Sequence, residues 1–152
     1  MRRPSRQQEK INPLCRKTGP RGNRHRGVNV AGQNIEIAKK GYAAYEAGDI
    51  ETVLKDFDDD IEWSIPGNST LSGTYRGKDK FTELLGKLAE KSFTPTQDRF
   101  LADGDDVVVL SHVTAGGESG LQADVLTYRN GKLVKAQTIG DTAMFERVFG
   151  TK

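Results

Sequence analysis

Hydrophobic and polar positions follow a helical spacing in the segment after residue 34. Apolar side chains recur every three or four residues from Ile35 to Ala47, which predicts an amphipathic helix. Asn34 stands directly before this segment and suits an N-cap, and Gly48 suits the residue that ends a helix. The next residue, Asp49, is expected to cap a second helix.

The second predicted helix is short and leads into an alternating strand. Its apolar face comprises Ile50, Val53, Leu54 and Phe57. The three aspartates at residues 58–60 are expected to stop it, because like charges at a helix C-terminus oppose the dipole. Ile61, Trp63 and Ile65 then alternate with polar residues, which predicts a half-buried strand that ends at Pro66.

A third helix is predicted after a polar loop over residues 68–77, and a series of strands follows it. Helical spacing places one apolar face on Phe81, Leu84, Leu85 and Leu88. Strands are predicted over residues 97–102, 107–115, 121–128 and 133–139. Asn130-Gly131 joins the last two and is a strong hairpin signal, and a short helix or strap is expected over residues 142–149. Helices followed by a meander of strands indicate an α+β fold.

Charge divides the chain into two parts. Residues 1–33 contain nine basic side chains and one acidic side chain, whereas the remainder contains 14 basic and 20 acidic ones. The first part has no helical or strand periodicity and is predicted to be a disordered basic tail. Three interpretations of it are open: a solvated tail or over-long start, an organelle-targeting segment, or an arm that binds RNA or phosphate weakly through its charge. No nucleic-acid-binding role is expected elsewhere.

Few residues are available for metal or cofactor chemistry. Cys15 is the single cysteine and lies in the basic tail, so no internal disulfide is possible. His112 is the one histidine after the tail, which makes a zinc site unexpected. The sequence has no glycine-rich phosphate loop and no run of about 18 apolar residues. We therefore expect a cytoplasmic protein with no metal, no cofactor and no membrane span.

The order of these motifs resembles the nuclear-transport-factor-2-like superfamily, and above all its SnoaL-like and ketosteroid-isomerase-like branch. The resemblance covers residues 35–150 and is carried by the Gly48-Asp49 helix junction, the strand I-E-W-S-I-P-G, the segment G-T-Y-R-G-K-D-K-F and the hairpin Y-R-N-G-K-L-V. It implies one domain over residues 34–152. In that domain a cone-shaped, curved and mostly antiparallel sheet wraps over three helices, as in a cystatin-like α+β barrel. It also implies a pocket and a homodimer through the outer sheet face.

The resemblance gives partial guidance on the site. In the steroid isomerases of this superfamily a general-base carboxylate precedes the proline of this strand, and Ile65 occupies that position here. Their catalytic tyrosine falls at Gly41, and Tyr42 is rotated by about 100° from it on a helix. Their oxyanion-stabilising acid aligns with Asp124. The isomerase mechanism is therefore not supported, while a carboxyl that an apolar cone keeps protonated remains possible.

Three residues are the candidate catalytic groups, and each has a structural alternative. His112 is a general base or a hydrogen-bonded core or interface residue. Asp124 faces the pocket or is solvated at a strand edge, because both faces of residues 121–128 carry apolar members. Asp141 is catalytic or is the N-cap of the segment that follows it.

Two functions agree with these patterns. The residues expected to line the pocket are Tyr42, Tyr45, Phe57, Trp63, Ile65 and Tyr128. The first hypothesis is a cofactor-independent acid/base enzyme, of isomerase, cyclase or hydrolase type, that acts on a small lipophilic molecule. The alternative is a domain without catalysis that binds such a molecule or serves as a dimerising scaffold.

Overall fold

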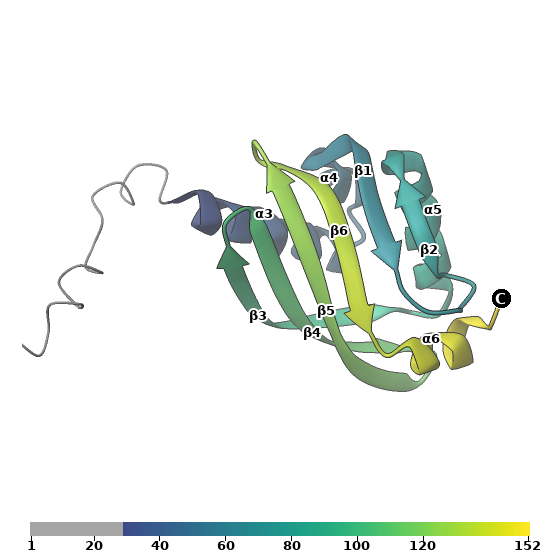
Figure 1. Ribbon diagram of the computed structural model, residues 1–152. Coiled ribbons are helices and arrows are strands. Elements are labelled where there is room, and N and C mark those ends of the chain that lie inside the picture. Colours follow the sequence, from purple (N-terminus) through teal and green to yellow (C-terminus); the bar gives the residue numbers. More distant parts are fainter. Residues whose placement is uncertain (1–28) are drawn as a thin grey trace, which may run out of the picture.

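A curved six-stranded sheet forms the frame of the protein (Figure 1). The computed structural model describes residues 29–152. The strands lie in the order β2-β1-β6-β5-β4-β3. Strands β1 and β6 are parallel, and every other neighbouring pair is antiparallel. The predicted α+β fold with a mostly antiparallel, curved sheet is confirmed.

The elements follow the predicted order, with one additional strand. The strands are β1 (Phe57–Ile65), β2 (Gly73–Arg76), β3 (Thr94–Asp103), β4 (Asp106–Ala115), β5 (Glu118–Arg129) and β6 (Lys132–Gly140). The helices of the described residues are α3 (Asn29–Glu46), α4 (Ile50–Lys55), α5 (Gly77–Glu90) and α6 (Thr142–Phe149).

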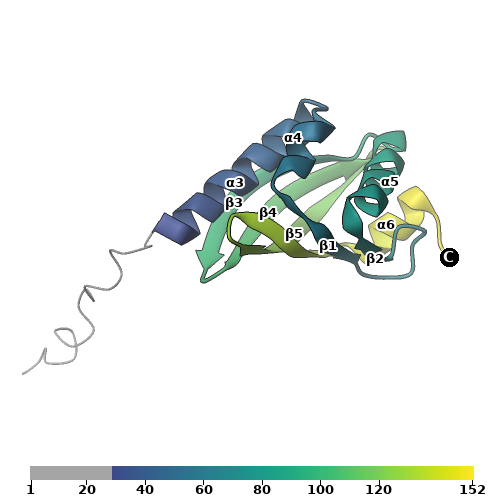
Figure 2. The ribbon, with the colours of Figure 1, turned by 90° about the horizontal axis from the view of Figure 1, so that it is seen from above.

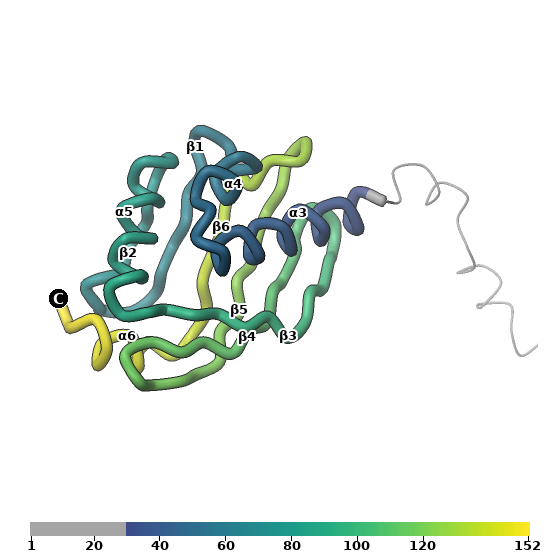
Figure 3. Tube along the Cα trace, turned by 180° about the vertical axis from the view of Figure 1, so that it is seen from behind, coloured from purple at the N-terminus to yellow at the C-terminus, as the bar shows by residue number. Residues whose placement is uncertain are grey.

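The three helices that the structure describes before β3 cover one face of the sheet. Helices α3, α4 and α5 lie on the same side in the view from above (Figure 2). Seen from behind, α3 runs across the strands and α5 lies near β1 and β2 (Figure 3). Helix α6 lies at the end of the sheet, against β5. The core fills the space between the helices and the concave face of the sheet.

Strand irregularities accompany the curvature of the sheet. The pairing register shifts between Gln97 and Arg99 in β3 and between Thr127 and Tyr128 in β5. Such bulges bend a strand and increase its twist. Alternation still holds along β4, where Val107, Val109 and the residues that follow at every second position are buried. The concave face is therefore buried and mainly apolar, with Ser111 as a polar member on β4.

The predicted cap at Asp49, the helix end at Gly48 and the hairpin turn at Asn130-Gly131 are confirmed. The Asp49 carboxylate accepts a hydrogen bond from the Thr52 backbone amide at 3.2 Å and caps α4. Gly48 has a φ of 75°, the left-handed conformation that glycine adopts at low cost. Asn130 and Gly131 both have positive φ, as a two-residue type I′ hairpin between β5 and β6 requires.

The start of the first helix was predicted wrongly. Helix α3 begins at Asn29, so Asn34 lies inside the helix and is not its N-cap. Asn34 is 4% exposed and precedes the buried Ala38 by four residues, which places both on the inner face of the helix. The helix therefore extends into the segment predicted as tail. The prediction for residues 1–28 lies outside the described residues.

Two further predictions near β1 are wrong. Phe57 and the aspartates at residues 58–60 belong to strand β1, whose pairing with β6 is irregular between Phe57 and Glu62. Asp59 and Asp60 are exposed there, so their charges are solvated. The expected loop over residues 68–77 contains β2, in which Tyr75 pairs with Trp63. A four-residue strand with polar members has no alternation long enough to detect.

No helix within residues 29–152 has both the length and the apolar composition needed to cross a membrane.

Candidate functional site

An apolar pocket lies between the helices and the concave face of the sheet. Its volume is about 100 Å³. The apolar residues around it come from α3, α4, β1, α5, β5 and β6 and from the segment before β3 and helix α6. They include Ile37, Ala38, Val53, Phe57, Trp63, Ile65, Phe81, Leu84, Leu85, Leu88, Phe93, Leu126, Leu133 and Phe145. A cavity of this order holds a ligand about the size of one aromatic ring.

Three aromatic rings form one wall of the pocket. The Phe57 ring lies 4.8 Å from Phe81, centroid to centroid, and Phe81 lies 5.0 Å from Trp63. Phe57 and Trp63 are stacked with an angle of 24° between their planes. These rings come from one strand and one helix, which fixes their relative positions. A flat apolar molecule can pack against such a wall.

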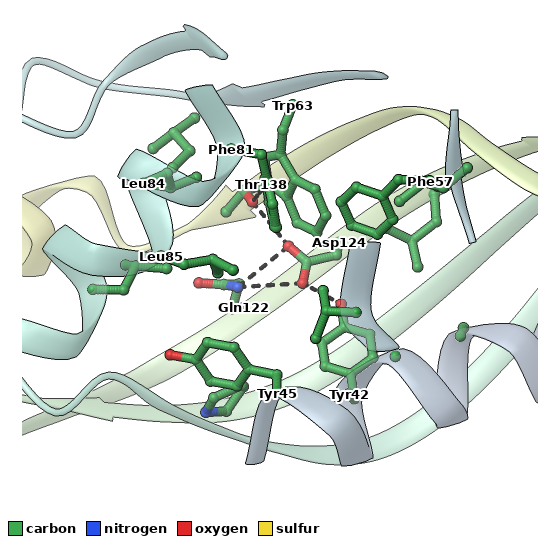
Figure 4. Close-up of a pocket in the computed structure, with 18 of the residues that line it drawn as sticks. Tyr42, Tyr45, Phe57, Trp63, Phe81, Leu84, Leu85, Gln122, Asp124 and Thr138 are labelled. Carbon is green, nitrogen blue, oxygen red and sulfur yellow. Dashed lines mark hydrogen bonds between the residues drawn. The ribbon is translucent and has the colours of Figure 1, made fainter. Parts of the chain in front are cut away.

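The polar end of the pocket is built around Asp124 on β5 (Figure 4). The Asp124 side chain is 2% exposed. The Tyr42 hydroxyl donates to its Oδ2 at 2.5 Å, and the Thr138 hydroxyl donates to its Oδ1 at 2.9 Å. The Gln122 amide Nε2 donates to both carboxyl oxygens, at 3.2 and 3.4 Å. Three elements therefore direct donors toward one buried carboxyl group.

The direction of the Thr138 hydrogen bond is set by its other neighbour. The Trp63 indole Nε1 donates to Thr138 Oγ1 at 2.9 Å. An indole N–H can only donate, so the Thr138 oxygen accepts from it and its own hydrogen is free to point at Asp124. The only Trp of the chain is thus joined to Asp124 through Thr138.

Burial and hydrogen bonding act in opposite directions on Asp124. Removal from water raises the pKa of its carboxyl group, and this is the largest effect. The hydrogen bonds from Tyr42, Thr138 and Gln122 lower the pKa, but the net shift is upward. The pKa of Tyr42 is raised well above its ordinary value, first by burial and then by the Asp124 charge. Burial therefore moves the pKa of Asp124 toward neutral pH and the pKa of Tyr42 away from it.

The remaining predicted pocket residues are in place. Tyr45, Phe57, Trp63, Ile65 and Tyr128 all line the pocket. The Tyr45 hydroxyl donates to the Phe93 carbonyl oxygen at 2.7 Å, so its polar end is satisfied by the protein. Tyr42 also lines the pocket, and its contact with Asp124 was not expected from its rotation relative to the family position.

His112 lies outside the pocket, contrary to the expectation that it handles protons there. It belongs to β4, but its side chain is 64% exposed. Its Nε2 lies 3.9 Å from Asp98 Oδ2. The neighbouring positions Ser111 and Val113 are buried, so strand alternation turns His112 to the outer face of the sheet.

Asp141 also lies outside the pocket and caps α6. Its Oδ1 accepts a hydrogen bond from the Met144 backbone amide at 2.9 Å. Asp141 does not line the pocket within the described part of the chain. The capping interpretation is the one that the structure supports, and Asp124 alone of the three candidates lines the pocket.

Sequence analysis missed two polar residues of the site. Gln122 and Thr138 lie on β5 and β6, at positions that pair with Gly140 and Asp124 respectively. Once Asp124 is known to face inward, alternation places Gln122 on the same face two residues earlier. Thr138 had no comparable signal, because its partner across the strands depends on the register of the hairpin.

Metal ligands do not gather in the described part of the chain. No group of three His, Cys, Asp or Glu side chains in residues 29–152 is arranged to hold a metal ion.

Comparison with known proteins identifies the family. Residues 38–136 match the model of the SnoaL-like domain. The chain belongs to the SnoaL-like family. The predicted resemblance to the nuclear-transport-factor-2-like superfamily is confirmed, and several solved structures that the chain resembles are described as NTF2-like.

Individual relatives agree with this assignment. An uncharacterised protein of Mycobacterium tuberculosis is 26% identical over 94 residues, which cover 60% of this chain and 72% of the relative. A protein of unknown function with a cystatin-like fold from Xanthomonas campestris is 29% identical, with a TM-score of 0.71 over 78% of this chain and 98% of its own. TerC, co-crystallised with polyporic acid, is 27% identical, with a TM-score of 0.69 over 78% of this chain and 99% of its own.

Proposed function

We propose that this SnoaL-like domain binds a small, mainly apolar molecule with one oxygen-bearing group, and that Asp124 exchanges a proton with it. The observation that carries the proposal is the buried Asp124 carboxyl group at the polar end of an apolar pocket. An aromatic wall and, beside it, a carboxyl group with three donors suit a ligand with one flat apolar part and one polar part.

Proton exchange follows from the environment of Asp124. A raised pKa brings a carboxyl group closer to neutral pH, where it passes a proton in either direction more easily. When it is ionised, such a group is a stronger base than an exposed aspartate. Taking a proton from carbon breaks a C–H bond, forms an O–H bond on Asp124 and leaves the electron pair on the ligand as an enolate. This step requires the ligand and Asp124 alone.

Similarity to TerC also supports the proposal that the pocket binds a small molecule. TerC was co-crystallised with polyporic acid and is 27% identical over 78% of this chain and 99% of its own. A relative of this fold that co-crystallises with a small organic compound agrees with a ligand-binding role for the pocket. The kind of ligand proposed for this protein is inferred from the residues of its own pocket.

The test is a proton-exchange experiment in D₂O. A panel of single-ring ketones and phenols is incubated with the protein, and exchange of ligand hydrogens is followed by NMR. The wild type is expected to accelerate exchange for at least one compound that it binds, and Asp124→Asn is expected to keep binding but lose exchange. Asp141→Asn, the same change at a position that caps α6, is the matched control and is expected to exchange normally.

The outcomes separate the possibilities. Acceleration that persists in Asp124→Asn would place the chemistry elsewhere. Binding without acceleration of any compound would favour the second candidate, a domain that binds a small molecule without catalysis. Ile65 supports that candidate, because the strand position next to Pro66 is an apolar part of the pocket wall and supplies no second acid or base.

A further inference from the structure

Gln122 holds an acceptor that the protein leaves without a partner. Its side chain is 8% exposed, and its Oε1 is buried with no hydrogen bond from the described residues. The Nε2 end of the same amide donates to both Asp124 oxygens. In the close-up, the amide nitrogen points toward Asp124 and the oxygen points away from it, on the side of Leu85 (Figure 4).

The orientation of this amide is fixed by the carboxyl group beside it. Asp124 already accepts hydrogen bonds from the hydroxyls of Tyr42 and Thr138, so its oxygens serve as acceptors. Turning the amide over would set Oε1 against those oxygens, and two acceptors repel each other. Asp124 therefore holds Nε2 toward itself and leaves Oε1 directed away from the network.

The neighbours of Oε1 offer it no hydrogen-bond donor. On the neighbouring strand β6, Gln122 pairs with Gly140, which has no side chain. A Cβ at Gly140 would lie 3.6 Å from Oε1, so the missing side chain keeps that side clear. Leu85, on the helix across the pocket, has no hydrogen to donate. Gln122 itself lines the pocket, so its amide group belongs to the pocket wall.

We infer that Gln122 Oε1 accepts a hydrogen bond from a hydroxyl group of the ligand, so that the pocket selects hydroxylated aromatic or enolic compounds over their ethers and hydrocarbons. This inference rests on the proposed function, because it requires that a small molecule enters the pocket. An amide oxygen accepts and cannot donate, so the ligand must supply the hydrogen. The flat wall of Phe57, Trp63 and Phe81 favours a planar ring beside that hydroxyl.

Selection of this kind follows from the burial of the acceptor. A site built to hydrogen-bond a hydroxyl group rejects the analogue that lacks it, since the buried partner is then left unsatisfied. A ketone or ether oxygen at the same place would bring acceptor against acceptor. Gln122 is thus a specificity-determining residue, distinct in role from Asp124.

The experiment compares three probes that share one methyl-substituted ring: p-cresol, with a hydroxyl group; p-xylene, with a methyl group of similar size in its place; and 4-methylanisole, in which the oxygen is methylated and cannot donate. Dissociation constants are measured by NMR titration of the ¹⁵N-labelled full chain, with the Trp63 indole N–H as a pocket reporter. The wild type is expected to bind p-cresol about 2- to 10-fold more tightly than 4-methylanisole, the range that one hydrogen bond supplies. In Gln122→Leu this preference is expected to fall below about twofold.

A second variant separates the two ends of the amide. Gln122→Leu removes the Oε1 acceptor and also one donor to Asp124, whereas Thr138→Val removes a donor to Asp124 and keeps Oε1. The preference for p-cresol is expected to persist in Thr138→Val. Gln122→Met, with an unbranched side chain, replaces Gln122→Leu if the latter does not give a folded spectrum.

Each outcome decides the inference. Equal binding of p-cresol and 4-methylanisole to the wild type overturns it and leaves the proposed function standing. A preference that survives in the Gln122 variants, or that disappears equally in Thr138→Val, also overturns it, because Oε1 is then not the acceptor. Failure of all three probes to bind counts against the pocket proposal itself.

Discussion

Burial of the Asp124 carboxyl group costs hydration free energy, and the same burial favours proton exchange with a ligand. A carboxyl group that is 2% exposed loses its hydration, and the protein offsets part of that loss with three donors. If the hydrogen bonds compensated fully for the lost hydration, the pKa of the carboxyl group would stay at its ordinary value. The net rise in its pKa shows that compensation is partial, which is the condition for exchanging a proton with a ligand.

The Tyr42 hydroxyl is predicted to tune Asp124. Tyr42→Phe removes a donor that lowers the Asp124 pKa, so the pKa should rise further. Loss of the hydrogen bond should also cost about 1 kcal/mol of stability. Carbon-13 NMR of the Asp124 carboxyl and chemical denaturation measure the two effects. Tyr45→Phe is the control, because that hydroxyl donates to a backbone carbonyl and should leave the Asp124 titration unchanged.

Stability is predicted to depend on pH through Asp124. Its pKa is higher in the folded chain than in the unfolded one, so its contribution is complete below the unfolded value of about 3.9. That contribution is lost as pH rises through the folded pKa, at about 1.4 kcal/mol per unit of upward shift.

Denaturation of the wild type and Asp124→Asn between pH 4 and 8 provides the measurement. The wild type should lose stability relative to the variant as pH rises. If the stability of the two proteins changed with pH in the same way, the ionised carboxyl group would not be destabilised in the folded state.

At the scale of elements, the sequence predicted where most helices and strands lie along the chain. It did not predict which face of strand β5 points into the core. The alternation of Ile61 and Ile65 and the apolar face of α5 are strong patterns that survive packing, and both were predicted correctly. Strand β5 has apolar residues on both faces, so its inward face could not be chosen from residues alone. The Tyr42–Asp124 contact joins residues 82 positions apart, and its geometry depends on the curvature of the whole sheet.

The Asp141 helix cap is predicted to be structural only. Asp141→Ala should destabilise the protein by about 0.5–2 kcal/mol through loss of the hydrogen bond to the Met144 amide. Ligand binding and proton exchange should be unaffected under conditions where the variant is folded. Asp141→Asn keeps a capping oxygen and should recover most of the stability. A folded Asp141→Ala protein that binds ligand but lacks exchange would return Asp141 to the catalytic site.

At the scale of the whole molecule, the outer face of the sheet is a second apolar surface. Leu121 on β5 is 66% exposed and Ile139 on β6 is 52% exposed. Ile139 pairs with Ala123, two residues from Leu121 on the same face, so these side chains form one patch. His112, which pairs with Leu121, borders it. Exposed apolar side chains gathered on one face are typical of an interaction surface.

We propose that a second copy of the chain covers this patch. The wild type is predicted to have twice the 16.7 kDa mass of the chain in analytical ultracentrifugation, and Leu121→Asp is predicted to shift it toward one copy. Val30→Asp introduces the same charge at an exposed apolar residue of α3 and is the control, expected to leave the mass unchanged. A wild type that sediments as a single copy at all concentrations would contradict the proposal.

The titration of the Asp124 carboxyl group, followed by carbon-13 NMR with and without p-cresol, tests the central claim most directly. We predict a pKa above that of an ordinary aspartate in the free protein, because burial outweighs the three hydrogen bonds. We also predict that the titration shifts when p-cresol enters the pocket. An Asp124 that titrates at or below the ordinary value, and does so identically with every compound tested, would contradict the proposed role of the pocket.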